Sequence, residues 1–132
     1  MEKITKKWLE RAQYDLSTAK VMLESHRYLY VTFMCQQALE KILKAILIQH
    51  DQEAPRIHNL VRLAELAKVY HLLADTDQEF LANLTPFAIE SRYGDYKRRL
   101  SEIVDKKAAH QYFKESQRIF QCLKRILNKS KS

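Results

Sequence analysis

The residue types best suited to chemistry gather in one stretch near residue 95. It reads Arg92-Tyr93-Gly94-Asp95-Tyr96-Lys97-Arg98-Arg99 and places two phenol rings, four cations and one carboxylate around the only glycine of the chain. Tyrosine rings stack on bases, and arginine bridges phosphates or stacks on a ring. The stretch therefore suits contact with RNA or a nucleotide. It suits equally a structural loop whose tyrosines fill gaps in the core and whose arginines are solvated.

A second set of polar residues lies within an apolar run, Cys35–Ala45. Gln37, Lys41 and Lys44 are spaced by four and three residues, so they share one face of a helix. With Glu40 on an adjoining strip, this face presents an amide, a carboxylate and two ammonium groups that can hold an anion or the backbone of a loop. The simpler interpretation is a solvated helix surface with an internal ion pair between Glu40 and a lysine.

Several enzyme classes lack their sequence motifs here. One glycine cannot form a GxGxxG or GxxxxGK phosphate loop, and neither GxSxG nor HExxH occurs. The five histidines are scattered, and Cys35 and Cys122 are isolated, so we expect no metal site and no cofactor. Buried, reduced thiols in a cytosolic protein are the simplest account of the two cysteines.

The net charge also favours an anionic partner. Lys plus Arg outnumber Asp plus Glu by 23 to 16, a formal charge of +7. Most of the excess lies in the second half, with 10 basic and 8 acidic residues up to position 66 and 13 basic and 8 acidic residues after it. Such a surplus favours nucleic acid, a nucleotide or an acidic protein face as partner, although it also serves solubility.

Length and hydropathy indicate the organisation of the chain. The 132 residues fit one domain, which we place at residues 1–128, with a polar tail at 129–132. The N-terminus has no apolar signal core, and no apolar run approaches the roughly 20 residues of a membrane span. We therefore expect a cytoplasmic protein without membrane attachment.

Apolar residues recur at spacings of three and four along most of the chain, which predicts amphipathic helices. Asn59 is a candidate N-cap, Thr76 and Glu79 form a capping-box pattern, and Pro86 should kink or end the helix that follows this box. The expected helices span Ile4–Glu24, Tyr28–Gln49, Asn59–His71, a stretch after Thr76, and Asp105–Asn128. We predict an all-α fold, an up-and-down antiparallel bundle of four to five helices.

The sequence resembles the HEPN domain family in a set of residues that occur in one order along nearly the whole chain. They are Trp8, Ala12, Asp15-Leu16 and Ala19, then Gln36–Lys41 with Lys44-Ala45, then Pro55, His58, Leu60 and Leu63, and finally Arg92–Tyr96. The resemblance implies a helical bundle that pairs as a homodimer. It also implies association with a minimal nucleotidyltransferase, often as a toxin–antitoxin pair.

Many proteins of the family that this sequence resembles are metal-independent ribonucleases. They use an arginine and a histidine with four to six residues between them, at a site shared across the dimer. No arginine here is followed by a histidine at that spacing, and the nearest imitation is Lys106 with His110. Without the pair, a base for the 2′-hydroxyl and a cation for the developing phosphorane are not supplied in the familiar way. The sequence accordingly resembles the branch that binds nucleotides or the partner enzyme.

We therefore predict a nucleotide- or RNA-binding partner of a minimal nucleotidyltransferase. The expected binding residues are Arg92, Tyr93, Asp95, Tyr96, Lys41 and Lys44. Arg92 would meet phosphate, a tyrosine would stack on a base, and Asp95 would orient the arginine or accept from a sugar hydroxyl. A loop hydrogen bond is the structural alternative for Asp95. His58 either contacts a phosphate or fixes its loop to the second helix.

Two other functions remain compatible with the sequence. One is a ribonuclease toxin with a non-standard site, Arg92 with His58. The other is a non-catalytic dimerisation scaffold. Metal-free cleavage of generic RNA would favour the first, and absence of nucleotide or RNA binding at low salt would favour the second.

Overall fold

The computed structural model describes residues 1–88 and 102–129. Within these ranges the chain forms helices and no strand, which confirms the all-α prediction. The long helices are α1 (Lys3–Glu24), α2 (Tyr28–Gln49) and α6 (Lys106–Lys129). The short elements are α3 (Leu60–Leu66), α4 (Asp75–Leu84) and two turns of 3-10 helix, η1 (Tyr70–Leu72) and η2 (Thr85–Ala88).

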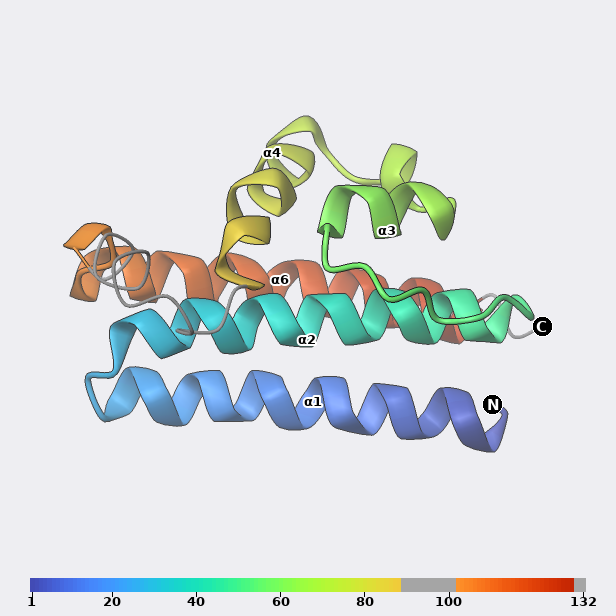
Figure 1. The fold of residues 1–132 in the computed structure, drawn as a ribbon, viewed down its shortest axis with the longest axis horizontal. Helices are drawn as coiled ribbons and strands as arrows, with labels where there is room; N and C mark the ends of the chain where they lie inside the picture. Colours follow the sequence, from blue (N-terminus) through green and yellow to red (C-terminus); the bar gives the residue numbers. More distant parts are fainter. Residues whose placement is uncertain (89–101, 130–132) are drawn as a thin grey trace.

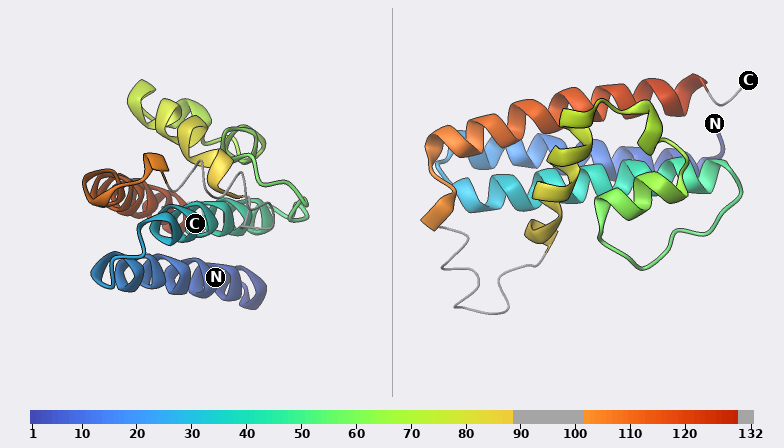
Figure 2. Two further views of the ribbon diagram at one scale, coloured as in Figure 1. Left: turned by 60° about the vertical axis from the view of Figure 1, so that its left-hand side comes forward. Right: turned by 90° about the horizontal axis from the view of Figure 1, so that it is seen from above.

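The three long helices lie side by side, with α2 between α1 and α6 (Figures 1 and 2). α1 runs antiparallel to α2, as expected for an up-and-down pair. α6 runs in the same direction as α2, because the chain between them returns to the end at which α2 begins (Figure 1). α3 and α4 belong to this return and cover one face of the bundle.

The sequence of α2 explains its central position. Its apolar residues cover more than one stripe, so the helix can pack against neighbours on several sides. The fully buried side chains of α2 include Leu39, Ile42, Leu43 and Ile46. α1 and α6 each contribute a single buried face to this core, which in α6 contains Ile119 and Phe120. Both ends of α2 coincide with the limits predicted from its periodicity.

α3 is shorter than the predicted helix over 59–71. It begins as expected, since the Asn59 side chain accepts a hydrogen bond from the Arg62 backbone N–H at 3.1 Å. It ends at Leu66, because Lys68 takes a positive φ of 61° and closes the helix with 3.0 Å bonds from the N–H groups of Lys68 and Val69. This left-handed ending is usually made by glycine. The pattern of apolar residues continues past it, so periodicity alone overextends the helix.

The predicted capping box at the start of α4 is wrong. The helix begins at Asp75, with Ala74 at the N-cap and no side-chain cap, so Thr76 already lies within the first turn. Asp75 and Asp77 place negative charge at this end, which the helix dipole favours. α4 ends at Leu84, two residues before Pro86, as the proline predicts.

Neither cysteine forms a disulfide. Cys35 is buried in the core, and this burial raises the pKa of its thiol to about 12. A thiol in this state is protonated and a poor nucleophile. Among the described residues, no helix combines the length and apolar character needed to cross a membrane.

Candidate functional site

The residues predicted to recognise a nucleotide divide between two parts of the chain. Arg92, Tyr93, Asp95 and Tyr96 lie outside the described residues, so their roles stay predictions. Lys41, Lys44 and His58 are described, and their surroundings can be given atom by atom.

Both α2 lysines are held in ion pairs within the fold. Lys44 Nζ donates to Glu40 Oε2 at 2.9 Å, and the side chains of the pair are only 7% and 6% exposed. Lys41 pairs with Asp15 of α1 and so joins the two helices. The internal pair between Glu40 and a lysine, foreseen as the simpler interpretation of this face, is present. Contact of either lysine with a nucleotide stays a prediction.

His58 ties the connection before α3 to the middle of α2. Its ring Nδ1 lies 2.9 Å from Glu40 Oε1, and its backbone carbonyl accepts a 2.9 Å hydrogen bond from Gln36 Nε2. Gln36 also donates to Glu40 at 3.2 Å, and Gln37 donates to Gln36 at 2.8 Å. The His58 side chain is still 64% exposed, so the ring is anchored on one side and open to solvent on the other.

The pKa of Glu40 is lowered although its carboxylate is buried. Burial is the largest influence and acts to raise the pKa, because it disfavours the charged form. Hydrogen bonds from Lys44 and His58, the positive charge of Lys44 and the bond from Gln36 together outweigh burial. Glu40 is therefore the anionic centre of a cluster in which the polar groups satisfy one another.

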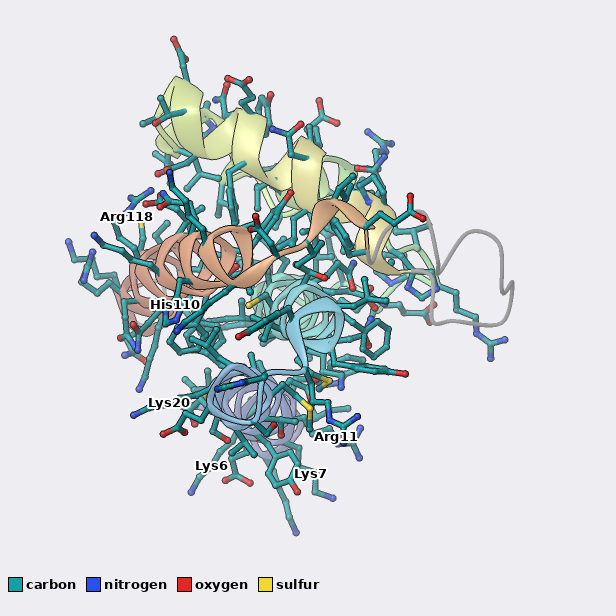
Figure 3. All side chains as sticks on the ribbon, turned by 90° about the vertical axis from the view of Figure 1, so that its left-hand side faces the viewer. Lys6, Lys7, Arg11, Lys20, His110 and Arg118 are labelled. Atoms are coloured by element: carbon teal, nitrogen blue, oxygen red, sulfur yellow. The ribbon has the colours of Figure 1, made fainter. Side chains whose placement is uncertain are left out.

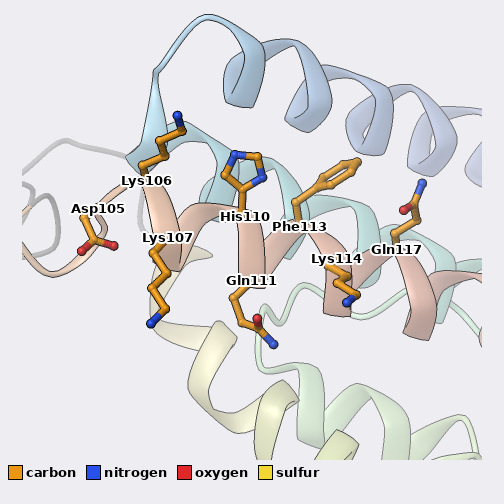
Figure 4. Close-up of a pocket in the computed structure, with 8 residues that line it drawn as sticks. All are labelled: Asp105, Lys106, Lys107, His110, Gln111, Phe113, Lys114 and Gln117. Carbon is orange, nitrogen blue, oxygen red and sulfur yellow. The ribbon is translucent and has the colours of Figure 1, made fainter.

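A different arrangement is found on the first turns of α6. An open recess of about 880 Å³ is centred on this part of the helix. Its lining residues are Asp105, Lys106, Lys107, His110, Gln111, Phe113, Lys114 and Gln117. His110, Phe113 and Gln117 point towards α1, whereas Lys107 and Gln111 point away from it (Figure 4). Three ammonium groups and one imidazole thus lie on the first turns of α6, and Lys106 and His110 share the side of the helix that carries the half-buried ring of Phe113.

The cations of this recess have no partner among the described residues. Lys106, Lys107, His110 and Lys114 are exposed and take part in no ion pair or hydrogen bond there. The single carboxylate of the lining, Asp105, is engaged as the N-cap of α6 and accepts a 2.8 Å bond from the Ala108 N–H. Figure 3 shows His110 on the same side of the bundle as Lys20 of α1. The recess is therefore a concentration of uncompensated positive charge.

Comparison with known proteins assigns the family. The family model of the HEPN domain matches residues 5–126. The chain belongs to the HEPN domain family. This confirms the resemblance carried by the residues of α1, α2 and the connection to α3. A search of curated proteins returns no match.

Two solved structures share the fold of this HEPN chain. The protein TT1696 from Thermus thermophilus is 23% identical, with a TM-score of 0.77 over 94% of this chain and 98% of that one. The protein ST0689, described as an archaeal HEPN homologue, is also 23% identical, with a TM-score of 0.71 over 96% of this chain and 99% of that one. At this identity the likeness establishes the common helical bundle.

The sequence reasoning missed most of the α6 recess. It noticed Lys106 and His110 only as an imperfect copy of the HEPN ribonuclease pair, and it did not select Lys107 or Lys114. A signal was available in the spacing. Residues 107, 111 and 114 recur at four and three, as do 106, 110 and 113, so two polar strips run along the start of this helix.

Proposed function

We propose that this HEPN protein is a binding module for the phosphate groups of a nucleotide or of RNA. The observation that carries the proposal is the α6 recess, where exposed cations without ion-pair partners in the described part of the chain gather on the first turns of the helix. Ammonium groups already paired within a fold must give up a partner to meet a phosphate, whereas these need give up only water. Neutralisation of phosphates by lysine also releases counterions, which drives association at low salt.

The remaining predictions for this chain fit the same proposal. A homodimer associated with a minimal nucleotidyltransferase, as a toxin–antitoxin pair in the cytoplasm, is supported by membership of the HEPN family. Arg92, Tyr93, Asp95 and Tyr96 would add an arginine for phosphate and rings for base stacking. Their contribution can be separated from that of the recess by substituting the two sets independently.

A binding measurement tests the recess directly. A fluorescein-labelled single-stranded octauridylate and a fluorescent ATP analogue are titrated with the protein at about 0.1 M salt, and anisotropy is recorded. The double variant Lys107→Glu/Lys114→Glu should raise the dissociation constant for both probes at least tenfold, because it replaces attraction of phosphate by repulsion. Unchanged affinity in this variant would contradict the proposal.

A matched control makes the same change of charge elsewhere. Lys3→Glu/Lys6→Glu substitutes two exposed lysines on α1, near the opposite end of the bundle from the recess. At about 0.1 M salt the screening length is about 10 Å, so charges at that distance act weakly on the site. The control should change the dissociation constants less than threefold. Equal losses in both variants would indicate a response to net charge alone.

A ribonuclease is the second candidate function, and the geometry of His58 favours it. Glu40 holds Nδ1 of the ring, which leaves Nε2 on the exposed side, and a histidine so oriented can act as a general base. Arg92 would supply the cation. Incubation of the labelled RNA with the protein in EDTA should leave it intact if the binding module is correct. Cleavage that is lost in both His58→Ala and Arg92→Ala would instead establish the enzyme.

A further inference from the structure

The α6 recess continues into a second hollow along the junction of α1 and α6. This second hollow has a volume of about 210 Å³ and shares Phe113 and Gln117 with the first. Its remaining lining residues are Gln13, Leu16, Ser17, Lys20, Phe120 and Gln121. We call the second hollow, together with the side of the recess that faces α1 (Lys106, His110 and Phe113), the α1–α6 groove. Residues 106 to 121 of α6 border it, a length of about 22 Å at 1.5 Å per residue.

The chemistry of the α1–α6 groove changes from one end to the other. The end near residue 106 is cationic, with Lys106 and His110 of α6 and Lys20 near the end of α1. The end near residue 121 presents side-chain amides from Gln13, Gln117 and Gln121 and the hydroxyl of Ser17. Leu16 and Phe120 are buried beneath this second part, and Phe113 lies at the junction. Charge and hydrogen-bonding capacity are thus separated along one surface.

We infer that the α1–α6 groove binds a single-stranded segment of RNA several nucleotides long, with phosphate at the cationic end and bases along the amide end. The inference rests on the proposed function and specifies its ligand. Lysine is a point charge suited to phosphate but reads no base. Glutamine amides both donate and accept, so they match the edges of unpaired bases. Phe113 offers its ring to a base between the two ends.

A double helix does not fit this distribution of groups. In double-stranded RNA the base edges face a deep and narrow major groove, and proteins contact mainly phosphates and 2′-hydroxyls. Such a ligand would use the lysines and leave the amides without partners. A mononucleotide would likewise occupy only part of a groove of this length. The amide end therefore distinguishes an extended single strand from both alternatives.

The first measurement compares ligands of increasing length. Dissociation constants are measured for fluorescein-labelled uridine mono-, di-, tri- and tetranucleotides and for a labelled RNA duplex of eight base pairs, at one salt concentration. The affinity should rise at least tenfold from the mononucleotide to the tetranucleotide, since each stacked base contributes about 1–3 kcal/mol. The duplex should bind more weakly than the tetranucleotide.

Substitutions at the two ends should then have different effects. Lys20→Gln/Lys106→Gln should reduce the salt dependence of binding, by about 0.7 in the slope of log K against log salt for each phosphate that is no longer neutralised. Gln117→Ala/Gln121→Ala should leave this slope unchanged and remove most of the gain in affinity with length. All four residues are exposed, so circular dichroism should show an intact fold in both variants.

Gln111→Ala provides the control, because Gln111 also lines the recess but points away from α1 (Figure 4). It should retain the full gain with length. Absence of binding by every probe would overturn the proposed function together with this inference. Binding of the mononucleotide and tetranucleotide with equal affinity, or preference for the duplex, would overturn only the inference. Equal loss of the length effect in Gln111→Ala would overturn the assignment to the α1–α6 groove.

Discussion

The two lysines of α2, Lys41 and Lys44, have the opposite surroundings to Lys107 and Lys114 of α6. Lys44 is buried against Glu40, within a cluster that also holds His58 and Gln36. Lys107 and Lys114 are exposed and unpaired within the described part of the chain. The comparison teaches that the number of cations is a poor guide to a binding surface. What matters is which cations the fold has already neutralised, because only the others are available to an anionic ligand.

The largest expected effect concerns the buried ion pair between Lys44 and Glu40. Lys44→Ala should lower the free energy of unfolding by about 3 kcal/mol, because it leaves the buried carboxylate of Glu40 without its ammonium partner. Urea denaturation followed by circular dichroism measures the change. Affinity for RNA should be unaffected under conditions in which the variant is folded. If Lys44→Ala had normal stability and weakened binding, Lys44 would instead be a residue that binds the RNA.

Acid should produce the next largest effect through Glu40. Its pKa in the folded protein is lowered, so the cluster stabilises the fold above the unfolded pKa of about 4.3, and this contribution is lost as the pH falls through the folded pKa. The loss should be smaller than in Lys44→Ala, because a protonated carboxyl still forms hydrogen bonds. Urea unfolding between about pH 7 and pH 3 measures it. In Glu40→Gln this part of the pH dependence should be absent.

A smaller effect is expected from the exposed side of the same cluster. His58→Ala removes the ring that binds Glu40 but keeps the backbone carbonyl that Gln36 holds. Since the ring is largely solvated, the loss of unfolding free energy should be about 1 kcal/mol. Asn is a useful second substitution, because its amide can donate in place of Nδ1. Rescue of stability by His58→Asn would support the anchoring role of this position.

The smallest effect on stability should come from α6. Lys107→Ala and Lys114→Ala remove exposed ammonium groups without partners in the described ranges, so the free energy of unfolding should change by less than about 0.5 kcal/mol. The same variants should weaken RNA binding. A gain of stability, from reduced repulsion among the cations of the recess, would sharpen the contrast with Lys44. A loss comparable to that of Lys44→Ala would remove it.

The sequence predicts the long helices well and the short ones less well. The limits of α2 follow from an apolar pattern that covers most of its surface, and α1 begins one residue from its expected start. The prediction for α3 is too long because a left-handed residue at Lys68, which no local pattern announces, ends the helix. The Thr76–Glu79 pattern fails as a helix start because the helix begins one residue earlier, and a capping box requires its threonine outside the helix.

The candidate site is harder to predict because burial, and the contacts that a side chain makes with other helices, are tertiary properties. Lys44 and Lys114 each lie within an amphipathic helix, and nothing in their immediate neighbours distinguishes them beyond Glu40 and Glu115 nearby. Glu40 pairs with Lys44, whereas Glu115 pairs with Arg118, which also binds Asp77 of α4. Both of these carboxylate pairs lie within one helix, whereas the burial of Glu40 and the bond from Arg118 to Asp77 depend on how helices distant in sequence pack together. Sequence spacing shows which face of a helix carries a side chain, but it does not show whether the charge of that side chain is paired.

The parallel course of α2 and α6 has an electrostatic consequence. Both helices begin at the end of the bundle where α1 finishes (Figure 1). The N-terminus of a helix carries about half a positive elementary charge and the C-terminus about half a negative one. Two N-termini and one C-terminus of the long helices meet at this end, so their dipoles give it a net positive charge. This backbone field has the same sign as the lysines of the recess. A polyanion would be drawn to that pole during diffusion, and its capture rate would decline as ionic strength rises.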